Sequence, residues 1–529
     1  MGPEDESRLE TQTLSAAEEE PGLAFTVPGL TILGHPDLRR VGERAALLDL
    51  SSGREALLAR GEPGFSPPGE SAPRPLAVAN LSRRPWRLRP TADGGVRLLG
   101  GDSPMPLAAD GEPVVGERLL SAAEVTRGVV LLLARRVVLL LHRFHPAFPP
   151  DLPRYGLVGE SDRWLDVCRQ ISQVADLDVP VLLRGESGTG KELVAEALHR
   201  TGRRRERPFL ALNLGALPPS LAAAELFGTA RGAFTGAEQA RRGYFRRAHG
   251  GTLFLDEIGE TPPDVQPLLL RVLENGEIQT PGNEEPMRVD VRILAATDAD
   301  LEQAVAAGHF RGPLLHRLGG SEIRLPALRE RRDDIGRLLL HFLRQELAVV
   351  GEEHRLADPG PQGKPWLPAP WVARVAAAAW PGNVRQLRNI VRQLVIASRG
   401  AAEARIAAVE RLMDEAGHRG ADEEHAPRRP RVRTVYRSPQ EISEEELLAA
   451  LAANRWRPGP TARQLDISRP SLYVLLDTFS STRKAVDLTR EEILAARERC
   501  AGRLRDTAAL LRVSESGLKR RIKQLGLPP

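Results

Sequence analysis

The stretch Val181–Leu198, VLLRGESGTGKELVAEAL, runs from an apolar segment through three glycines and a lysine into a segment with helical character. Val179–Leu183 is typical of a buried strand. Gly185, Gly188 and Gly190 allow the backbone to curl so that its N–H groups point inward, and the following helix adds the positive end of its dipole. This combination predicts a phosphate-binding P-loop, and with it an α/β domain.

The side chains of this loop indicate a nucleoside triphosphate. Lys191 places a positive charge where the β- and γ-phosphates bind. Glu192 stands where most such loops carry a Ser or Thr hydroxyl for Mg²⁺, so the protein ligand of the metal is expected elsewhere. The residues expected to line the nucleotide are Gly185, Glu186, Ser187, Gly188, Thr189, Gly190, Lys191 and Glu192.

A second apolar strand, about 65 residues further on, ends in two carboxylates. In GGTLFLDEIGE, Asp256 and Glu257 follow the apolar run directly. Open α/β sheets bind ligands at the carboxyl ends of their strands, which predicts both side chains beside the P-loop. Asp256 is expected to hold Mg²⁺ and Glu257 to polarise the attacking water.

Length and composition place this motif in a larger protein. The chain has 529 residues, 41% of them hydrophobic and 27% charged, which predicts several globular domains. The net charge of +4 requires any nucleic-acid partner to meet a local basic face. Cys168 and Cys500 lack ligand spacing, which argues against a disulfide framework or a zinc site. No export signal or membrane-length apolar run is present, so a cytoplasmic location without a membrane partner is expected.

Composition along the chain predicts a multidomain fold. An acidic tail (1–22) precedes short β-rich runs (23–147), in which VVLLLARRVVLLL, 129–141, indicates two strands and a tight turn. A proline-containing linker leads to alternating strands and helices (154–405), the pattern of a parallel sheet with crossover helices. A polar linker (406–441) separates these from a helical C-terminal part (442–529).

The central segment resembles a known family. GESGTGKE, ELFG…RGAFTGA, GTLFLDEI, FRGPLLHRL, LPALRERRDDI and WPGNVRQLRN follow the order and spacing of the AAA+ domain of sigma-54-dependent transcriptional activators, over about residues 155–401. The resemblance implies an α/β P-loop ATPase with a helical lid, which uses ATP and Mg²⁺. It also implies a homo-oligomer, from dimer to hexameric ring, that remodels RNA polymerase holoenzyme carrying sigma-54.

The resemblance also implies roles for single residues. Asn213 is expected to pair with Glu257, and Arg385 to reach the nucleotide from the lid. Arg311 and Arg317 match arginines offered to the ATP of a neighbouring subunit. The GAFTGA segment matches a loop that contacts sigma-54, with an exposed aromatic ring at its tip. The residues of this loop are Gly232, Ala233, Phe234, Thr235, Gly236 and Ala237.

Two positions depart from the family pattern. Asp298 replaces an asparagine near the γ-phosphate, exchanging an amide donor for a carboxylate. Pro313 follows Arg311 and could redirect it. Two functions therefore stay open: an activator driven by ATP hydrolysis, and a DNA-bound regulator whose AAA+ ring is a weakly hydrolysing scaffold.

The C-terminal part contains an internal repeat. The segment that begins at Leu447 aligns without gaps with the segment that begins 46 positions later, at Ile493. Each copy resembles a Fis-type helix-turn-helix, which implies binding to enhancer-like double-stranded DNA. Basic residues concentrate in the second copy, whereas the first is expected to support dimerisation or packing. The predicted DNA contacts are Ser514, Ser516, Lys519, Arg520, Arg521 and Lys523.

The β-rich N-terminal region resembles a forkhead-associated (FHA) β-sandwich, a reader of phosphothreonine. The supporting stretches are VGERAALLDL, LAVANLSRRPW and the 129–141 hairpin. Arg44, Ser82 and Arg83 are the candidate phosphopeptide residues. Glu43 and Pro85 depart from the family pattern at this edge, so a phosphothreonine-binding module and a purely structural one both stay open.

Overall fold

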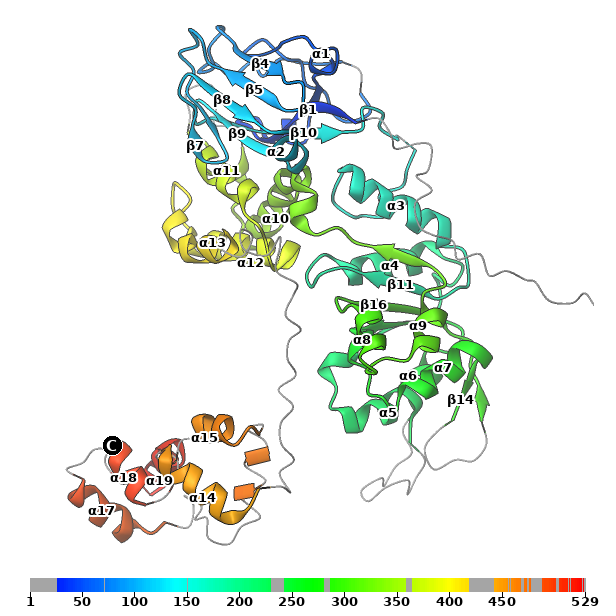
Figure 1. Cartoon of the computed structure of the whole chain (residues 1–529), viewed down its shortest axis with the longest axis vertical. Helices are drawn as coiled ribbons and strands as arrows, with labels where there is room; N and C mark the ends of the chain where they lie inside the picture. Colours follow the sequence, from blue (N-terminus) through cyan, green and yellow to red (C-terminus); the bar gives the residue numbers. More distant parts are fainter. Residues whose placement is uncertain are drawn as a thin grey trace, which may run out of the picture. The chain divides into compact units, whose positions relative to one another are not determined.

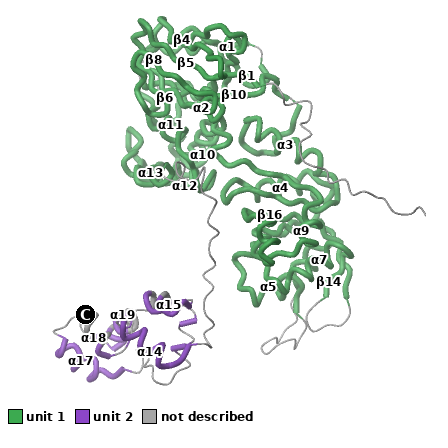
Figure 2. The backbone as a smooth tube through the Cα atoms, in the orientation of Figure 1, with its two compact units in different colours: residues 1–424 green, residues 425–529 purple. Residues whose placement is uncertain are grey.

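The computed structural model describes residues 26–417, apart from 71, 150, 230–241, 280–285 and 358–363. It also describes residues 442–527, with gaps at 455, 457, 468–470, 473–474, 477–487, 501–503, 512, 514 and 526. The chain divides into two compact units, residues 1–424 and 425–529 (Figure 2). Each unit is described by itself.

The N-terminal part consists of two antiparallel sheets around a common apolar core, a β-sandwich in the region where the sequence predicts an all-β module. The sheet orders are β2-β1-β10-β9-β6-β7 and β3-β4-β5-β8. Ala134 and Arg135 have φ of 46° and 54° in the turn between β9 and β10, as the tight turn requires. The elements are β1 (Val27–Gly34), β2 (Arg44–Ala46), α1 (Leu48–Ser51), β3 (Ala56–Leu58), β4 (Trp86–Pro90), β5 (Val96–Leu99), β6 (Leu107–Ala109), β7 (Glu112–Pro113), β8 (Glu117–Leu120), α2 (Ala122–Arg127), β9 (Val129–Leu133) and β10 (Val137–Phe144).

The central part is a five-stranded parallel sheet of order β12-β13-β16-β11-β17, covered by helices on both faces. Successive residues face opposite cores: Leu182 belongs to one apolar cluster and Leu183 to the other. The elements are α3 (Asp162–Val174), β11 (Val181–Arg184), α4 (Lys191–Thr201), β12 (Phe209–Asn213), α5 (Pro219–Phe227), α6 (Tyr244–Arg247), β13 (Thr252–Asp256), α7 (Gln266–Asn275), β14 (Glu277–Ile278), β15 (Met287–Arg288), β16 (Arg292–Thr297), α8 (Leu301–Ala306), α9 (Gly312–Leu318) and β17 (Glu322–Arg324).

A helical lid follows the sheet. It contains α10 (Ile335–Val350), α11 (Ala369–Ala377), α12 (Asn383–Ala397) and α13 (Glu410–Gly417). Met413 and Ala416 of α13 are buried in the same core as the other lid helices. The lid therefore continues into the stretch that the sequence suggested as the second linker.

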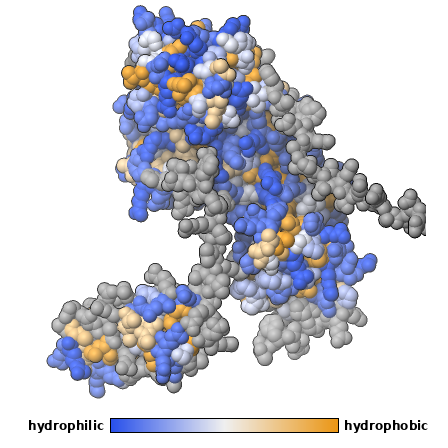
Figure 3. Space-filling view, in the orientation of Figure 1, coloured by the Kyte–Doolittle hydropathy of each residue, from blue (hydrophilic) through white to orange (hydrophobic). Residues whose placement is uncertain are grey.

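The β-sandwich and the lid share one apolar core. Leu33, Val130, Val138 and Leu140 of the sandwich cluster with residues of α10, α11 and α12, and α10 and α11 lie directly against the sheet that contains β9 and β10 (Figure 1). The sequence predicted two modules joined by a linker, whereas the structure packs them together. Hydrophilic side chains dominate the visible face of this unit (Figure 3).

The second unit contains two small helical cores, in agreement with the sequence repeat. The elements are α14 (Glu444–Ala453), α15 (Pro458–Gln464), α17 (Arg490–Arg499), α18 (Leu504–Leu510) and α19 (Glu515–Gln524). Equivalent positions are buried in both copies: Thr461 corresponds to Thr507 and Leu472 to Leu518, all at 0% exposure. Across the described parts of both units, no helix combines the length and apolar character needed to cross a membrane.

Candidate active site

The predicted P-loop lies between β11 and α4 with the expected glycine backbone. The three glycines of the loop have positive φ angles that other residues rarely adopt: 158° at Gly185, 81° at Gly188 and 110° at Gly190. A Cβ at Gly190 would have no neighbour within 4 Å, whereas one at Gly188 would lie 2.5 Å from the carbonyl oxygen of Gly382 in the lid. The loop is thus open at Gly190 and closely covered by the lid at Gly188.

The loop side chains are already organised. The Lys191 ammonium is buried and donates to the carbonyl oxygen of Gly185 at 2.7 Å. The Thr189 hydroxyl donates to the Glu186 carbonyl at 2.8 Å. Glu192 is exposed on α4, consistent with a metal ligand located elsewhere. The positive charge therefore sits inside the glycine curve, where phosphate oxygens would bind.

Asn213 and Asp256 meet at the carboxyl edge of the sheet. They are register partners on the parallel strands β12 and β13, and the Asn213 amide donates to Asp256 Oδ2 at 3.0 Å. The sequence instead suggested Glu257 as the partner of Asn213. Because Glu257 lies one residue past the strand with φ of 55°, its side chain does not follow the strand register.

Glu257 occupies an environment that favours its neutral form. Burial, the carboxylate of Asp298 and that of Asp256 raise the pKa of Glu257, while the Lys191 ammonium opposes them. A raised pKa suits a group that must take up a proton near neutral pH. Asp298, one of the two departures from the family pattern, thus acts directly on the predicted base.

The site fits ATP with Mg²⁺. Among the described residues, no group of three or more His, Cys, Asp or Glu side chains is placed to hold a metal by itself. Mg²⁺ commonly takes one or two protein carboxylates together with substrate phosphates and water. The site meets that requirement: the P-loop is open at Gly190, the Lys191 side chain is buried inside the loop, and Asp256 offers a carboxylate.

Side chains at the start of α12 contact the P-loop. Arg385 Nη1 donates to the Ser187 hydroxyl at 2.8 Å, which places this predicted residue at the loop. Asn383 was not predicted: it is fully buried with φ of 51°, and its amide donates to Glu186 Oε2 and to the Ser187 carbonyl, both at 3.1 Å. Its Oδ1 accepts from the backbone N–H of Leu328 at 2.8 Å. The WPGNVRQLRN motif contained this residue, but only the fold reveals its partners.

The two arginines expected to act in trans lie around α9. Arg311 precedes the helix, its backbone N–H donates to Gln266 Oε1 at 2.9 Å, and its side chain is exposed. Pro313 falls in the first turn of α9, where its missing N–H leaves no hydrogen bond unmade. The Arg317 side chain is 58% exposed, and its Nε lies 3.7 Å from Glu274. Both guanidinium groups are therefore on the surface, as residues completing another subunit's site must be.

The candidate phosphopeptide residues do not share contacts. Arg44 Nη2 donates to the Glu160 carbonyl at 2.7 Å and to Asp333 Oδ2 at 2.9 Å. The Ser82 hydroxyl accepts from the Arg84 N–H at 2.9 Å, and the Ser82 carbonyl accepts from the backbone N–H of Arg60 at 3.0 Å. Arg83 is exposed. The backbone of Arg60 is therefore paired with that of Ser82, whereas the Arg44 side chain faces the ATPase part of the chain.

Several predicted residues have no described side chain. The loop Gly232–Ala237 and Ser514 lie outside the described residues, as do the side chains of Ser516, Arg520 and Lys523 on α19. Lys519 is exposed on that helix. Arg521 is half-buried, and its Nε donates to the Leu488 carbonyl at 3.0 Å, so it holds the second copy together.

Comparison with known proteins identifies the central segment. Residues 157–324 match the model of the sigma-54 interaction domain, and residues 329–427 match that of the AAA+ ATPase lid domain. Residues 157–427 are thus similar to a sigma-54 interaction domain followed by an AAA+ ATPase lid domain. These matches confirm the predicted α/β P-loop ATPase fold with a helical lid for this segment.

Two curated relatives and one solved structure are similar to parts of this chain. The DNA-binding transcriptional regulator NtrC of Escherichia coli (strain K12) is 48% identical over 248 residues, covering 47% of this chain and 51% of the relative. The nitric oxide reductase transcription regulator NorR2 of Cupriavidus necator is 44% identical over 256 residues, covering 48% and 47%. The crystal structure of NtrX from Brucella abortus in complex with ATP is 29% identical and covers 70% of each chain with a TM-score of 0.43. The chain spans about half the length of the curated relatives it matches.

Proposed function

We propose that this protein is an ATP-dependent transcriptional activator that hydrolyses ATP to remodel RNA polymerase holoenzyme carrying sigma-54. The observation that carries the proposal is the match to the sigma-54 interaction domain, supported by the candidate residues Asp256 and Glu257 at the carboxyl edge of the sheet. Lys191 would hold the terminal phosphates, Asp256 would bind Mg²⁺, and Glu257 would accept a proton from the attacking water. The metal would neutralise charge on the phosphates when bound.

ATP turnover by the full chain tests the enzymatic part. The wild type is expected to hydrolyse ATP and Glu257→Ala to lose at least about 100-fold in kcat, because the general base is removed. Thr235→Ala is the matched control, expected to keep hydrolysis and lose sigma-54 binding. Equal rates for the wild type and Glu257→Ala would instead favour the second candidate, a weakly hydrolysing scaffold, which is motivated by Asp298 beside Glu257.

The sigma-54 contact is assigned to the loop Gly232–Ala237 through the GAFTGA motif. Phe234 of this loop would be buried against sigma-54, as aromatic anchor residues are at protein interfaces.

Completion of each ATP site by Arg311 or Arg317 of a neighbouring subunit requires a homo-oligomer. Sedimentation of the full chain with and without a non-hydrolysable ATP analogue tests assembly, and a monomer under both conditions would contradict it.

Binding to double-stranded DNA is assigned to the second C-terminal copy. Residues 442–479 carry four Arg and Lys against five Asp and Glu, whereas the aligned residues 488–525 carry ten against five. Only the second copy therefore offers phosphates a net positive surface. In a mobility-shift assay, replacing Arg520 and Lys523 with Ala should weaken binding sharply, and replacing Arg463 and Arg469 of the first copy should not. Equal effects of the two pairs would reject this division of roles, in which the first copy supports dimerisation or packing.

Recognition of a phosphothreonine protein is assigned to the edge of the β-sandwich that carries Ser82 and Arg83. Because the backbone N–H of Arg60 donates to the Ser82 carbonyl, we add Arg60 to this candidate set. Titration of the full chain with phosphothreonine and unphosphorylated threonine peptides, for the wild type and Ser82→Ala, tests the assignment. Equal binding of both peptides would indicate that the β-sandwich has a purely structural role.

A further inference from the structure

The β-sandwich contacts both sides of the connection between the α/β part and the lid. That connection runs from the end of β17 at Arg324 to the start of α10 at Ile335. Arg44 of β2 donates to the Glu160 carbonyl, just before α3 in the α/β part, and to the Asp333 carboxylate in the connection. Arg44 and Asp333 are only 10% and 9% exposed. Through Nη2, the Arg44 guanidinium therefore joins the sandwich both to the α/β part and to the connection that leads to the lid.

A second arginine repeats this arrangement from the lid. Arg337 of α10 lies 2.5 Å from Glu160 Oε2 and also donates to the Gly42 carbonyl of the sandwich at 3.4 Å. Arg332 donates to the carbonyl oxygens of Gly128 in the sandwich and Ala377 in the lid, at 2.7 and 2.9 Å. The sandwich is thus bound across the connection by several independent hydrogen bonds and by the shared apolar core.

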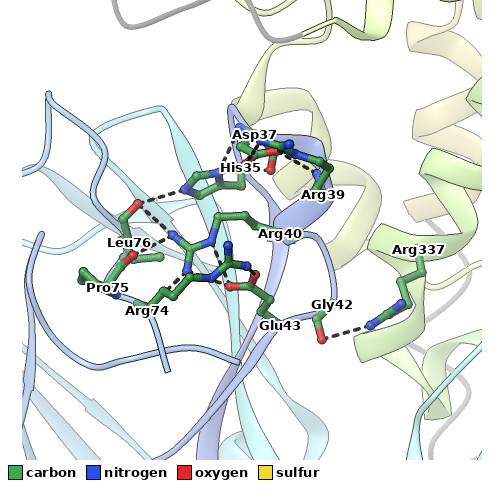
Figure 4. Close-up of polar contacts among 10 residues, drawn as sticks. All are labelled: His35, Asp37, Arg39, Arg40, Gly42, Glu43, Arg74, Pro75, Leu76 and Arg337. Atoms are coloured by element: carbon green, nitrogen blue, oxygen red, sulfur yellow. Dashed lines mark hydrogen bonds and ion pairs between the residues drawn. The ribbon is translucent and has the colours of Figure 1, made fainter. Parts of the chain in front are cut away.

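The loop that presents Gly42 and Arg44 is itself held firmly (Figure 4). Arg40 and Glu43 form a buried ion pair at 2.7 Å, 7% and 2% exposed. Arg40 also donates to the carbonyl oxygens of Pro75 and Leu76 at 2.7 and 3.0 Å, and the His35 ring contacts the Leu76 carbonyl at 3.1 Å. A buried pair with its remaining donors satisfied fixes the loop geometry, so Arg44 is presented in one position.

The connection leads directly to the nucleotide loop. Asp334, adjacent to Asp333, accepts from the backbone N–H groups of Glu160 and Ser161 at 2.6 and 3.0 Å. The Arg331 guanidinium lies 3.9 Å above the ring of Trp164 in α3 and reaches the Thr189 carbonyl at 3.5 Å. Beyond the connection, α10 packs on α12, whose first turn carries the P-loop contacts of Asn383 and Arg385. The orientation of this connection therefore sets how the lid meets the P-loop.

We infer that Arg44 is a positioning residue for ATP: by tying Glu160 to Asp333 it holds the lid where Asn383 and Arg385 reach the P-loop. This inference rests on the proposed ATPase function. It assigns Arg44, a candidate phosphate ligand by sequence, to the ATPase instead. The β-sandwich then acts as a brace on the nucleotide site in addition to any ligand it binds.

The test compares variants of the full chain that are folded at the assay temperature, as judged by circular dichroism. Arg44→Met keeps the length of the side chain and removes its donors, and Arg44→Lys keeps the charge with a single donor group. Arg39→Met is the matched control, because Arg39 is 83% exposed and pairs with Asp37 of the same loop. The dissociation constant of a fluorescent ATP analogue and the kcat and KM of ATP hydrolysis are measured for each.

Arg44→Met is expected to weaken binding of the analogue by about fivefold or more and to lower kcat, with Arg44→Lys intermediate and Arg39→Met unchanged. Hydrogen exchange of residues 185–191 should quicken in Arg44→Met alone. Unchanged binding and exchange in folded Arg44→Met would overturn the inference. If Arg44→Met does not fold, Arg44→Lys and Asp333→Asn carry the same comparison. Absence of hydrolysis in the wild type would count against the proposed function, while the binding and exchange measurements would still decide the role of Arg44.

Discussion

Gly336 offers a direct way to disturb the contact between the β-sandwich and the lid. It lies in the first turn of α10 against the backbone of β1, and a Cβ there would stand 2.5 Å from the Leu33 carbonyl oxygen and 2.8 Å from its Cα. Both atoms belong to β1, which lies between β2 and β10 in the six-stranded sheet, so a shift of Leu33 would disturb this sheet. Gly336→Ala must therefore push α10 away from the sheet.

The expected size of the effect follows from two opposing contributions. Overpacking of a close contact costs about 2 kcal/mol. Replacing glycine by alanine within a helix returns about 1 kcal/mol. We therefore expect Gly336→Ala to lower the free energy of unfolding by about 1 kcal/mol, when a neutral helical site would have raised it.

Urea unfolding of the full chain, followed by tryptophan fluorescence, measures this difference, because Trp366 and Trp371 lie in the shared core. Gly417→Ala is the control, since a Cβ at Gly417 in α13 would have no neighbour within 4 Å. The control should unfold at an equal or higher urea concentration than the wild type. A midpoint for Gly336→Ala at or above that of Gly417→Ala would refute the close packing of α10 on β1.

Three further predictions concern single polar groups. Burial lowers the pKa of His142 to about 3, so His142 is protonated in the unfolded chain before it is protonated in the folded one. The free energy of unfolding should therefore fall as the pH drops below the ordinary His pKa of about 6.5, by about 2 kcal/mol at pH 5. Thermal unfolding measures this decrease, which should be absent in His142→Gln. Asn383→Asp keeps the acceptor for Leu328 but sets a carboxylate beside Glu186 and the Ser187 carbonyl, so binding of an ATP analogue should weaken by about tenfold or more; unchanged affinity would contradict the role of the amide. Asp298→Asn removes a charge that raises the pKa of Glu257, so the acid limb of the ATPase pH profile should move to lower pH, and a shift to higher pH would argue against Glu257 as the base.

The sequence predicted what depends on neighbouring residues and missed what depends on strand register. The P-loop was predicted correctly because its strand, glycines and helix are contiguous between Val179 and Leu198. The partner of Asn213 was not, because the alignment of β12 with β13 brings Asp256 opposite it. The family resemblance implies Glu257 as the partner of Asn213, whereas the strand register places Asp256 there.

The contact between the sandwich and the lid is reflected in the sequence of two strands. An antiparallel strand with one solvent-exposed face alternates apolar and polar residues. Both β9 and β10 instead contain the unbroken apolar run VVLLL. In the structure, Leu131 and Leu139 face the interior of the sandwich, whereas Val130 and Val138 face the lid. The unbroken apolar runs therefore indicated that both faces of this sheet are covered.

The shared core constrains how a signal could pass from the sandwich to the ATPase. Two domains joined by a flexible linker influence each other only through collision or local concentration, whereas modules with a common core must move together or separate at an energetic cost. Arg44 and Gly336 both make close contacts between the sandwich and the ATPase part, next to the connection that leads to the lid. A ligand that binds the sandwich more tightly in one lid position would change ATP affinity, and ATP would change the affinity for that ligand by the same factor. Measuring phosphopeptide affinity with and without an ATP analogue in the wild type and in Arg44→Met therefore tests the coupling from the other side, since the brace predicts that any coupling shrinks when Arg44 is removed.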